Sequence, residues 1–353
     1  MTYETPEIRR PGVRAALDAL LAARRVVLTT HVNADGDGTG CQAALLALLL
    51  DAGAEAWIVN PTPFPDTFRF LVPDPGRILD AKSDEAARRC READLCVVVD
   101  TAEKSRIGRV NPLVDHLPKV VIDHHPADEE GIEGTLLQDT GASAAGELVY
   151  DLVLANGGPW TESVIDGLYV AILTDTGSFR FSNATPTAHR VVADLIARGA
   201  SPDELHRRVY ERTSTRRMRL LARALETLEV SPDGEVGWMV VPRDTYEALG
   251  CTSEDLDGMV DYPRSIDGVE VALLFRELEE GTVKLSLRSN GRVDVNALAR
   301  ELGGGGHVRA AGARVEGDVE TVIRRVVDRA VELAGVADEA GEVEPAGEEG
   351  VDP

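Results

Sequence analysis

The sequence predicts an α/β protein with two parts: an N-terminal domain whose mainly parallel sheet is flanked by helices, and a smaller C-terminal α/β domain. Residues 1–200 alternate short β-branched runs with helical stretches, which is the pattern of a parallel sheet. A second alternation of this kind begins after residue 230. The length of 353 residues also favours two domains, since one domain typically takes roughly 150 residues.

The N-terminal alternation consists of short apolar strands separated by helices. The predicted strands are 25–30, 56–60, 95–99 and 119–122. The predicted helices are 12–23, 39–52, 143–155, 161–173 and 185–199. Gly53 marks the end of the second helix, because glycine adopts the left-handed conformation that closes a helix at no steric cost.

Three further parts follow the N-terminal domain of residues 1–200. We predict an arginine-rich helical connector over 201–230 and a second domain over 231–335. The second domain should contain strands at 236–241, 269–275 and 282–288 and helices at 294–302 and 318–334. Residues 336–353 carry acids, no base and no periodicity, so we expect a disordered acidic tail.

The charge balance is strongly acidic. The chain has 37 Lys and Arg against 61 Asp and Glu, a formal charge of −24, and only 4% of its residues are aromatic. A grip on long nucleic acid needs a positive surface or stacking platforms, so this composition argues against one. The carboxylates either solvate the surface or hold cations.

Cysteine usage and the apolar runs predict a cytoplasmic protein. The four cysteines contain no Cys-x-x-Cys pair and make no disulfide framework in a chain of this length. The N-terminal residues lack the apolar segment of a signal peptide. The longest apolar run, 43–50, is too short to span a bilayer, so we expect no contact with a membrane.

Acidic and imidazole side chains follow the ends of predicted strands and of the apolar segment 168–174. They are His31, Asp35, Asp37, Asp100, Asp123, His124, His125 and Asp175. Because the carboxyl ends of parallel strands share one edge, we expect these side chains to gather there. Clustered carboxylates need cations, and aspartate with histidine but no cysteine suits Mn²⁺, Mg²⁺ or Fe²⁺. The number of candidates suits two ions that share a bridging carboxylate.

Each cluster also has a simpler interpretation by itself. An aspartate after a strand is most often a helix N-cap or a turn residue, and for Asp100 alone this would be preferred. His124 and His125 can form a polar pair, and the loop 33–38 can be a glycine-rich turn that lacks the distal Glu of a calcium loop. The conjunction of four clusters in one domain favours the metal site.

A second group of residues, near the C-terminus, predicts a phosphate site. Arg288 ends a predicted strand, and residues 303–306 are four glycines that precede His307. Glycine N–H groups approach an anion closely, and a guanidinium binds phosphate through two parallel hydrogen bonds. Alternatively, Gly303 ends the helix over 294–302 and the other glycines form a flexible loop.

These motifs resemble those of the DHH phosphoesterases. The four motifs of that family match, in order, His31-x-x-x-Asp35-x-Asp37, then Asp100, then Asp123-His124-His125, then Asp175. Residues 304–307 resemble its DHHA1 domain, and the stretch 174–189 is similar to the branch that degrades nanoRNA and dephosphorylates pAp. The resemblance covers about residues 15–333.

The resemblance implies two divalent ions, Mn²⁺ before Mg²⁺, Fe²⁺ or Co²⁺. One ion would be held by His31, Asp35 and Asp100, and the other by Asp37, Asp100, His124 and Asp175. The implied catalytic residues are Asp100, His124, His125 and Asp123. Of these, Asp123 would orient a histidine and His125 would face the substrate phosphate or the leaving group. Phosphate would be bound, across a cleft between the domains, by His125, Arg288, Gly304, Gly305, Gly306 and His307.

The implied function is hydrolysis of very short oligonucleotides. NanoRNA and dinucleotides such as pApA would yield mononucleotides, and pAp would yield AMP, by attack on phosphorus of a hydroxide that two metal ions activate. The alternatives are a soluble cyclic-di-AMP phosphodiesterase, a RecJ-like single-strand exonuclease and a non-catalytic nucleotide sensor. A family II pyrophosphatase should carry a lysine-rich clamp, whereas only Lys284 follows residue 200. The resemblance also predicts a homodimer.

Overall fold

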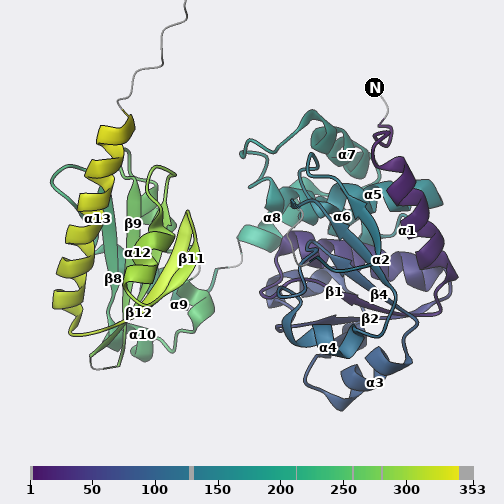
Figure 1. Cartoon of the computed structure of the whole chain (residues 1–353), viewed down its shortest axis with the longest axis horizontal. Coiled ribbons are helices and arrows are strands. Elements are labelled where there is room, and N and C mark those ends of the chain that lie inside the picture. The colour runs from purple at the N-terminus through teal and green to yellow at the C-terminus, as the bar shows by residue number, and fades with distance from the viewer. Residues whose placement is uncertain (1–2, 127–130, 212, 257, 280, 342–353) are drawn as a thin grey trace, which may run out of the picture. The chain divides into compact units, whose positions relative to one another are not determined.

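The computed structural model describes residues 3–126, 131–211, 213–256, 258–279 and 281–341. The chain forms two compact units, Met1–Arg212 and Thr213–Pro353 (Figure 1). Their boundary lies inside the stretch predicted as a connector. Helix α8 (Pro202–Tyr210) therefore belongs to the first unit and α9 (Thr215–Leu225) to the second.

The first unit is built on a six-stranded parallel sheet in the order β3-β2-β1-β4-β5-β6. Its strands are β1 (Arg25–Thr29), β2 (Glu55–Asn60), β3 (Ile78–Asp80), β4 (Leu95–Val99), β5 (Lys119–Asp123) and β6 (Thr135–Gln138). The predicted strands are confirmed, whereas β3 and β6 were not predicted. Both are short and lie at the edges of the sheet, where few residues are buried on both faces.

Helices cover both faces of this sheet, as a parallel sheet requires. Val26 and Leu28 face a core formed with α1 (Arg10–Ala22), α2 (Gly36–Asp51), α5 (Ala145–Asn156), α6 (Glu162–Asp175) and α7 (Pro186–Ala197). Val27 and Val98 face the opposite core, formed with α3 (Asp84–Glu92) and α4 (Asn111–Val114), which lie below the sheet in Figure 1. Short 3₁₀ turns at Asp66–Leu71, Pro75–Arg77 and Gly108–Val110 complete the unit.

Helix α2 begins at Gly36, three residues before its predicted start at Thr39. The Asp35 side chain accepts hydrogen bonds from the backbone N–H groups of Asp37 (3.0 Å) and Gly38 (3.2 Å), so it caps the helix. The glycines of the predicted loop are therefore helical. Asp37 consequently lies in the first turn of α2, so a helix and not a flexible loop positions its side chain.

The second unit contains a six-stranded sheet in the order β11-β12-β10-β9-β8-β7, antiparallel except for the β8–β9 pair. The strands are β7 (Glu229–Val230), β8 (Val236–Val241), β9 (Val271–Glu279), β10 (Thr282–Ser289), β11 (Gly305–His307) and β12 (Ala310–Glu316). Helices α12 (Val295–Glu301) and α13 (Val319–Gly341) pack on one face and α9 on the other. The shorter elements are α10 (Arg243–Ala248), a 3₁₀ turn at Ser253–Leu256 and α11 (Asp261–Arg264).

The C-terminal stretch divides at Gly341. Helix α13 continues to that residue, into the stretch predicted as a disordered tail, and residues 342–353 lie outside the described part of the chain. Among the described residues, no helix combines the length and the apolar character needed to cross a bilayer.

Candidate metal centre

Three strand ends and one helix end bring the predicted metal ligands together. His31 follows β1, Asp100 follows β4, and His124 follows β5. Asp175 was grouped with the strand ends, which is wrong: it is the last residue of α6. In each of three overlapping groups the ligand atoms lie within 4.8 Å of one another: His31-Asp35-Asp100, Asp37-His124-Asp175 and Asp100-His124-His125.

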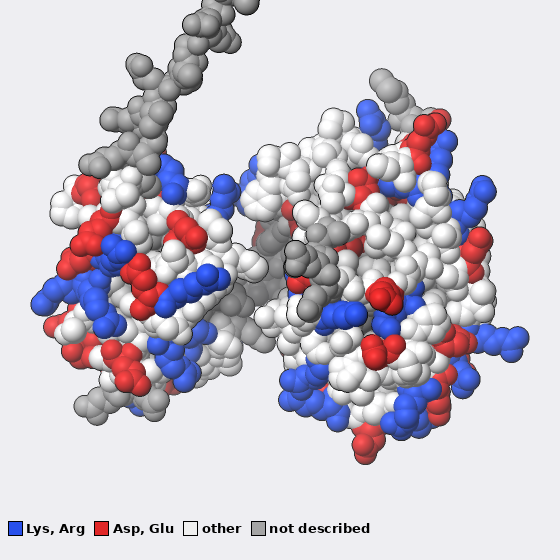
Figure 2. All heavy atoms as spheres, viewed as in Figure 1, with Lys and Arg blue, Asp and Glu red and all other residues white. Residues whose placement is uncertain are grey.

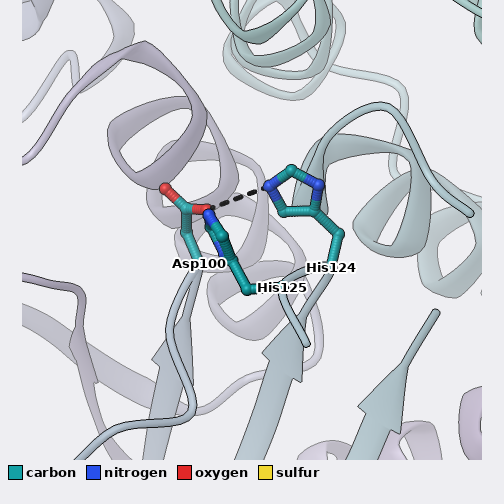
Figure 3. A group of neighbouring side chains, drawn as sticks. All are labelled: Asp100, His124 and His125. Atoms are coloured by element: carbon teal, nitrogen blue, oxygen red, sulfur yellow. Dashed lines mark ion pairs between the residues drawn. The ribbon is translucent and has the colours of Figure 1, made fainter. Parts of the chain in front are cut away.

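Asp100 lies at the centre of these groups. Its Oδ2 is 3.1 Å from Nε2 of His31, and its Oδ1 is 3.5 Å from Nε2 of His124. His125 contributes its Nδ1 at 3.8 Å from the same Oδ1, so both adjacent imidazoles face Asp100 (Figure 3). Asp100 is 2% exposed, has a left-handed backbone (φ +62°), and caps no helix in the described part of the chain. The N-cap interpretation of this residue is therefore wrong.

Two buried polar atoms of this cluster fit a bound cation. Oδ1 of Asp100 and Nε2 of His124 face each other at 3.5 Å, and neither has a hydrogen-bond partner among the described residues. The other ring nitrogen of His124, Nδ1, lies 3.2 Å from the carbonyl oxygen of Ala142 and donates to it, so Nε2 is the ring nitrogen that would bind a metal ion once it has lost its proton. Buried polar atoms without partners are costly, and a divalent ion between them would satisfy both.

Asp37 has a structural role that the sequence did not reveal. Its carboxylate is fully buried and accepts hydrogen bonds from the N–H groups of Ala145 (2.6 Å) and Gly146 (2.9 Å), the first two residues of α5. Asp37 therefore caps a helix that begins more than 100 residues later, and the helix dipole favours its negative charge. The same carboxylate is 3.7 Å from Nε2 of His124.

The electrostatics of this cluster favour protonated imidazoles. Burial alone would lower the pKa of His31 and of His124, but Asp100 and the neighbouring carboxylates outweigh burial and raise both pKa values to about 10. Burial opposes ionisation of Asp100, yet His124 and His31 hold its pKa below the usual range. Burial, together with Asp100, raises the pKa of Asp175 to about 6. Protons thus occupy the positions at which cations would compensate the carboxylates.

His125 and Asp123 form a separate pair at the edge of the cluster. Asp123 is buried, and its Oδ1 accepts from the backbone N–H (3.2 Å) and from Nδ1 (2.8 Å) of His125. The His125 side chain is 42% exposed. Because Nδ1 donates to Asp123, Nε2 is the ring atom available to a ligand. The histidine that Asp123 orients is therefore His125.

Asn183 is a further residue that the sequence did not reveal. Its Nδ2 donates to the carbonyl oxygens of Asp175 and Ser143, both at 3.1 Å, and so joins the end of α6 to the segment before α5. Asn183 lies in a loop after α6, and a lone asparagine in a polar loop carries no pattern that distinguishes it from a turn residue.

The predicted phosphate residues of the second unit lie around one strand. In the β-ladder, both Arg288 of β10 and His307 of β11 pair with Ala310 of β12, so their side chains emerge on the same face. Gly305 and Gly306 belong to β11, so the expectation of a flexible loop is wrong. A Cβ at Gly304 would overlap the carbonyl of Gly312, and one at Gly306 would lie 2.5 Å from the carbonyl oxygen of Ala310. These two glycines are therefore required for strand packing.

The comparisons with known proteins agree with the order of the motifs. Residues 25–172 match the DHH family, N-terminal domain, and residues 244–333 match the DHHA1 domain. The bifunctional oligoribonuclease and PAP phosphatase NrnA of Thermus thermophilus is 35% identical over 306 residues, which cover 86% of this chain and 88% of the relative. The protein of the same name from Bacillus subtilis is 30% identical, with 85% and 95% covered.

A solved structure has the same fold over nearly the whole chain. It is an exopolyphosphatase-related protein from Bacteroides fragilis, with a TM-score of 0.84 and 25% identity, and the match covers 95% of this chain and 100% of that one. The four motifs occur in order, their Asp and His side chains lie together, and the relatives match over most of their length. The chain therefore belongs to the DHH family of phosphoesterases and carries a DHHA1 domain.

Proposed function

We propose that this protein hydrolyses very short oligonucleotides, such as nanoRNA and pApA, to mononucleotides and pAp to AMP. The observation that carries the proposal is the unpartnered Oδ1 of Asp100 facing the unpartnered Nε2 of His124 inside a cluster of carboxylates. Relatives that span the chain at 35% and 30% identity are named oligoribonuclease and PAP phosphatase, which supports this substrate class.

In this proposal the cluster holds two divalent ions, Mn²⁺ before Mg²⁺, Fe²⁺ or Co²⁺. His31, Asp35 and Asp100 would bind the first, and Asp37, Asp100, His124 and Asp175 the second. Ions held there would lower the pKa of water at the site and neutralise charge on the phosphoryl oxygens. Among the described residues, the three ligand groups consist of carboxylate and imidazole without cysteine, which supports metals of this kind over a structural zinc ion.

The residues around the ions would orient the substrate and move a proton. His125, held at Nδ1 by Asp123, would transfer a proton from Nε2 to the ribose oxygen that leaves phosphorus. Arg288 and His307, on the same face of their sheet, would bind a substrate phosphate, and Gly305 would let its backbone approach that group. We also propose a cytoplasmic location and no grip on long strands, which the four free cysteines and the charge of −24 support.

The test is side-by-side kinetics with Mn²⁺ on pAp, pApA, cyclic di-AMP, a long single-stranded RNA and pyrophosphate. We expect turnover of pAp and pApA well above that of the other substrates. Asp100→Asn keeps the shape of the side chain but removes its charge, so we expect kcat/KM to fall by more than about 100-fold, since even outer partners of metal ligands contribute about 10–100-fold.

Asp18→Asn, on the exposed side of α1, is the matched control and should retain the activity of the unmodified protein. Preferential turnover of cyclic di-AMP or of the long RNA would contradict the proposal. Binding of pAp with no product under Mn²⁺ would favour a nucleotide sensor instead.

A further inference from the structure

Arg9 is a buried charged residue that lies outside the stretch matching the DHH domain and that no step of the proposed reaction uses. It immediately precedes α1, is only 3% exposed, and contacts three carboxylates. Its Nε donates to Asp139 (2.6 Å), its Nη2 to Glu147 (2.9 Å) and its Nη1 to Asp151 (3.2 Å). A guanidinium with each nitrogen committed is a rigid clamp, because its donors are coplanar and fixed in direction.

Two of these carboxylates, Asp139 and Glu147, hold the segment 139–147 in place. Asp139 accepts from the N–H of Gly141 (2.9 Å), and its own carbonyl oxygen accepts from the N–H of Ala142 (3.1 Å). Oε1 of Glu147 accepts from the N–H of Ser143 (3.0 Å). Arg9 thus binds both ends of a short stretch whose backbone groups are turned toward the metal cluster.

That stretch supports every member of one ligand group, two of them directly and Asp175 through Asn183. The carbonyl of Ala142 fixes the ring of His124, and the N–H groups of Ala145 and Gly146 hold Asp37. Ser143 is bound through its carbonyl to Asn183, whose Nδ2 also holds the backbone of Asp175. Asp37, His124 and Asp175 form one of the compact ligand groups.

The other ligand group is held differently. His31 is fixed by the carbonyl of Val32 (2.8 Å) and by Asp100 (3.1 Å), and Asp35 is fixed by the first turn of its own helix. Within the described residues, no hydrogen bond or ion pair joins His31, Asp35 or Asp100 to the segment 139–147. The two compact groups are therefore supported separately, although Asp100 also lies 3.5 Å from His124 of the other group.

We propose that Arg9 is a positioning residue selective for the second ion, acting through the segment 139–147 on Asp37, His124 and Asp175. This inference rests on the two-ion site of the proposed function. Without the guanidinium, Glu147 and Asp151 would be buried carboxylates with no cation, and the segment between them would shift to regain water. The ring of His124 and the carboxylate of Asp37 would then lose their fixed orientation.

The experiment is a Mn²⁺ titration of the full chain, with free Mn²⁺ measured by electron paramagnetic resonance. The unmodified protein should bind two ions. Arg9→Lys retains the charge but cannot contact three carboxylates, so we expect the dissociation constant of one ion to rise about 10–100-fold and that of the other to stay within about twofold. The Mn²⁺ concentration that gives half-maximal activity should rise by the same factor as the dissociation constant of the weakened ion. High Mn²⁺ concentrations should restore the activity.

Two further variants keep the result interpretable. Arg14→Lys, an exposed arginine of α1, should bind both ions as the unmodified protein does. Glu147→Gln keeps the acceptor for the N–H of Ser143 and removes one negative charge, so it should raise the dissociation constant of the same ion. This variant tests the inference even if Arg9→Lys fails to fold. The inference would be overturned if these variants raised the dissociation constants of both ions equally, or left both unchanged. The readout needs no substrate, so an unmodified protein that binds two Mn²⁺ without turnover would contradict the function alone.

Discussion

At the scale of single residues, carboxylates keep two imidazoles of the cluster protonated. Burial alone would lower both pKa values, but Asp100 and Asp35 raise the pKa of His31 to about 10, and Asp100, Asp37 and Asp175 raise that of His124 to about 10. Both rings are therefore protonated at neutral pH. A metal ion must bind to the neutral ring, so it has to displace these protons.

This competition predicts that Mn²⁺ binding releases protons and strengthens as pH rises. Because the pKa values in the folded protein are about 10, the protons are present at pH 7 and leave only as pH approaches 10 or as metal binds. Affinity should therefore rise between pH 6.5 and 9, by up to about tenfold per pH unit for each proton released. Calorimetric titration in two buffers of different ionisation enthalpy counts the protons. A proton count of zero would contradict these pKa values.

At the scale of secondary-structure elements, the site depends on close packing of α2 against α6. The two helices touch backbone to backbone, since a Cβ on Gly167 would lie 2.7 Å from the carbonyl oxygen of Gly40, and one on Gly40 would overlap the carbonyl of Gly167. Asp37 lies in the first turn of α2, and Asp175 is the last residue of α6. The distance between these helices therefore sets the distance between two ligands.

Gly40→Ala should separate the helices and disturb the site. The added methyl group has no room beside the backbone of α6, so we expect a loss of about 1–3 kcal/mol in the free energy of unfolding and weaker binding of one Mn²⁺ ion. Urea unfolding and Mn²⁺ titration measure both effects. Gly335→Ala in α13 is the control, because a Cβ there meets nothing within 4 Å, and it should be neutral or stabilise by up to about 1 kcal/mol.

Substitutions of two glycines around β11 test strand packing and phosphate binding independently. Gly304→Ala has no room beside β12 and should destabilise the second unit by about 1–3 kcal/mol. Gly305→Ala meets only Oδ1 of Asn296 at 3.9 Å, so it should fold normally. If the backbone of Gly305 approaches a phosphate, KM for pAp should rise with kcat little changed. Normal stability with unchanged KM for Gly305→Ala would exclude Gly305 from the phosphate site.

At the scale of the whole molecule, charge is dispersed. In the view of Figure 2, basic and acidic side chains are interspersed over both units and form no broad basic face. Three arginines of 201–230 form ion pairs: Arg208 pairs with Glu204, Arg216 with Asp255, and Arg223 with Glu226. This arrangement, with the net charge of −24, supports small anionic substrates over long strands.

Metal binding should stabilise only one of the two units. All the predicted ligands belong to Met1–Arg212, so Mn²⁺ at 100 times its dissociation constant should stabilise that unit by about 2.7 kcal/mol for each ion bound. Calorimetry of the full chain should show one transition that shifts upward with Mn²⁺ and returns with EDTA, and another that does not move. A single transition that shifts as a whole would show that the two units unfold together.

The elements that the sequence predicted well are those with many buried residues. Strands β1, β4 and β5 are apolar runs buried on both faces, and each was placed within about two residues. Helix α3 was missed because it is strongly polar, with only Ala86 and Cys90 buried. Burial leaves a pattern in the sequence, and a short edge strand or a solvent-facing helix leaves almost none.

The members of the candidate site and their order could be predicted from the sequence, because strand ends and turn residues are local features. How these side chains are held depends on contacts between residues far apart in the chain. Asp37 caps α5 across 108 residues, Arg9 reaches Asp139 across 130, and Asn183 joins Ser143 to Asp175. Such contacts depend on how helices and strands pack, so no periodicity or spacing along the chain encodes them in readable form.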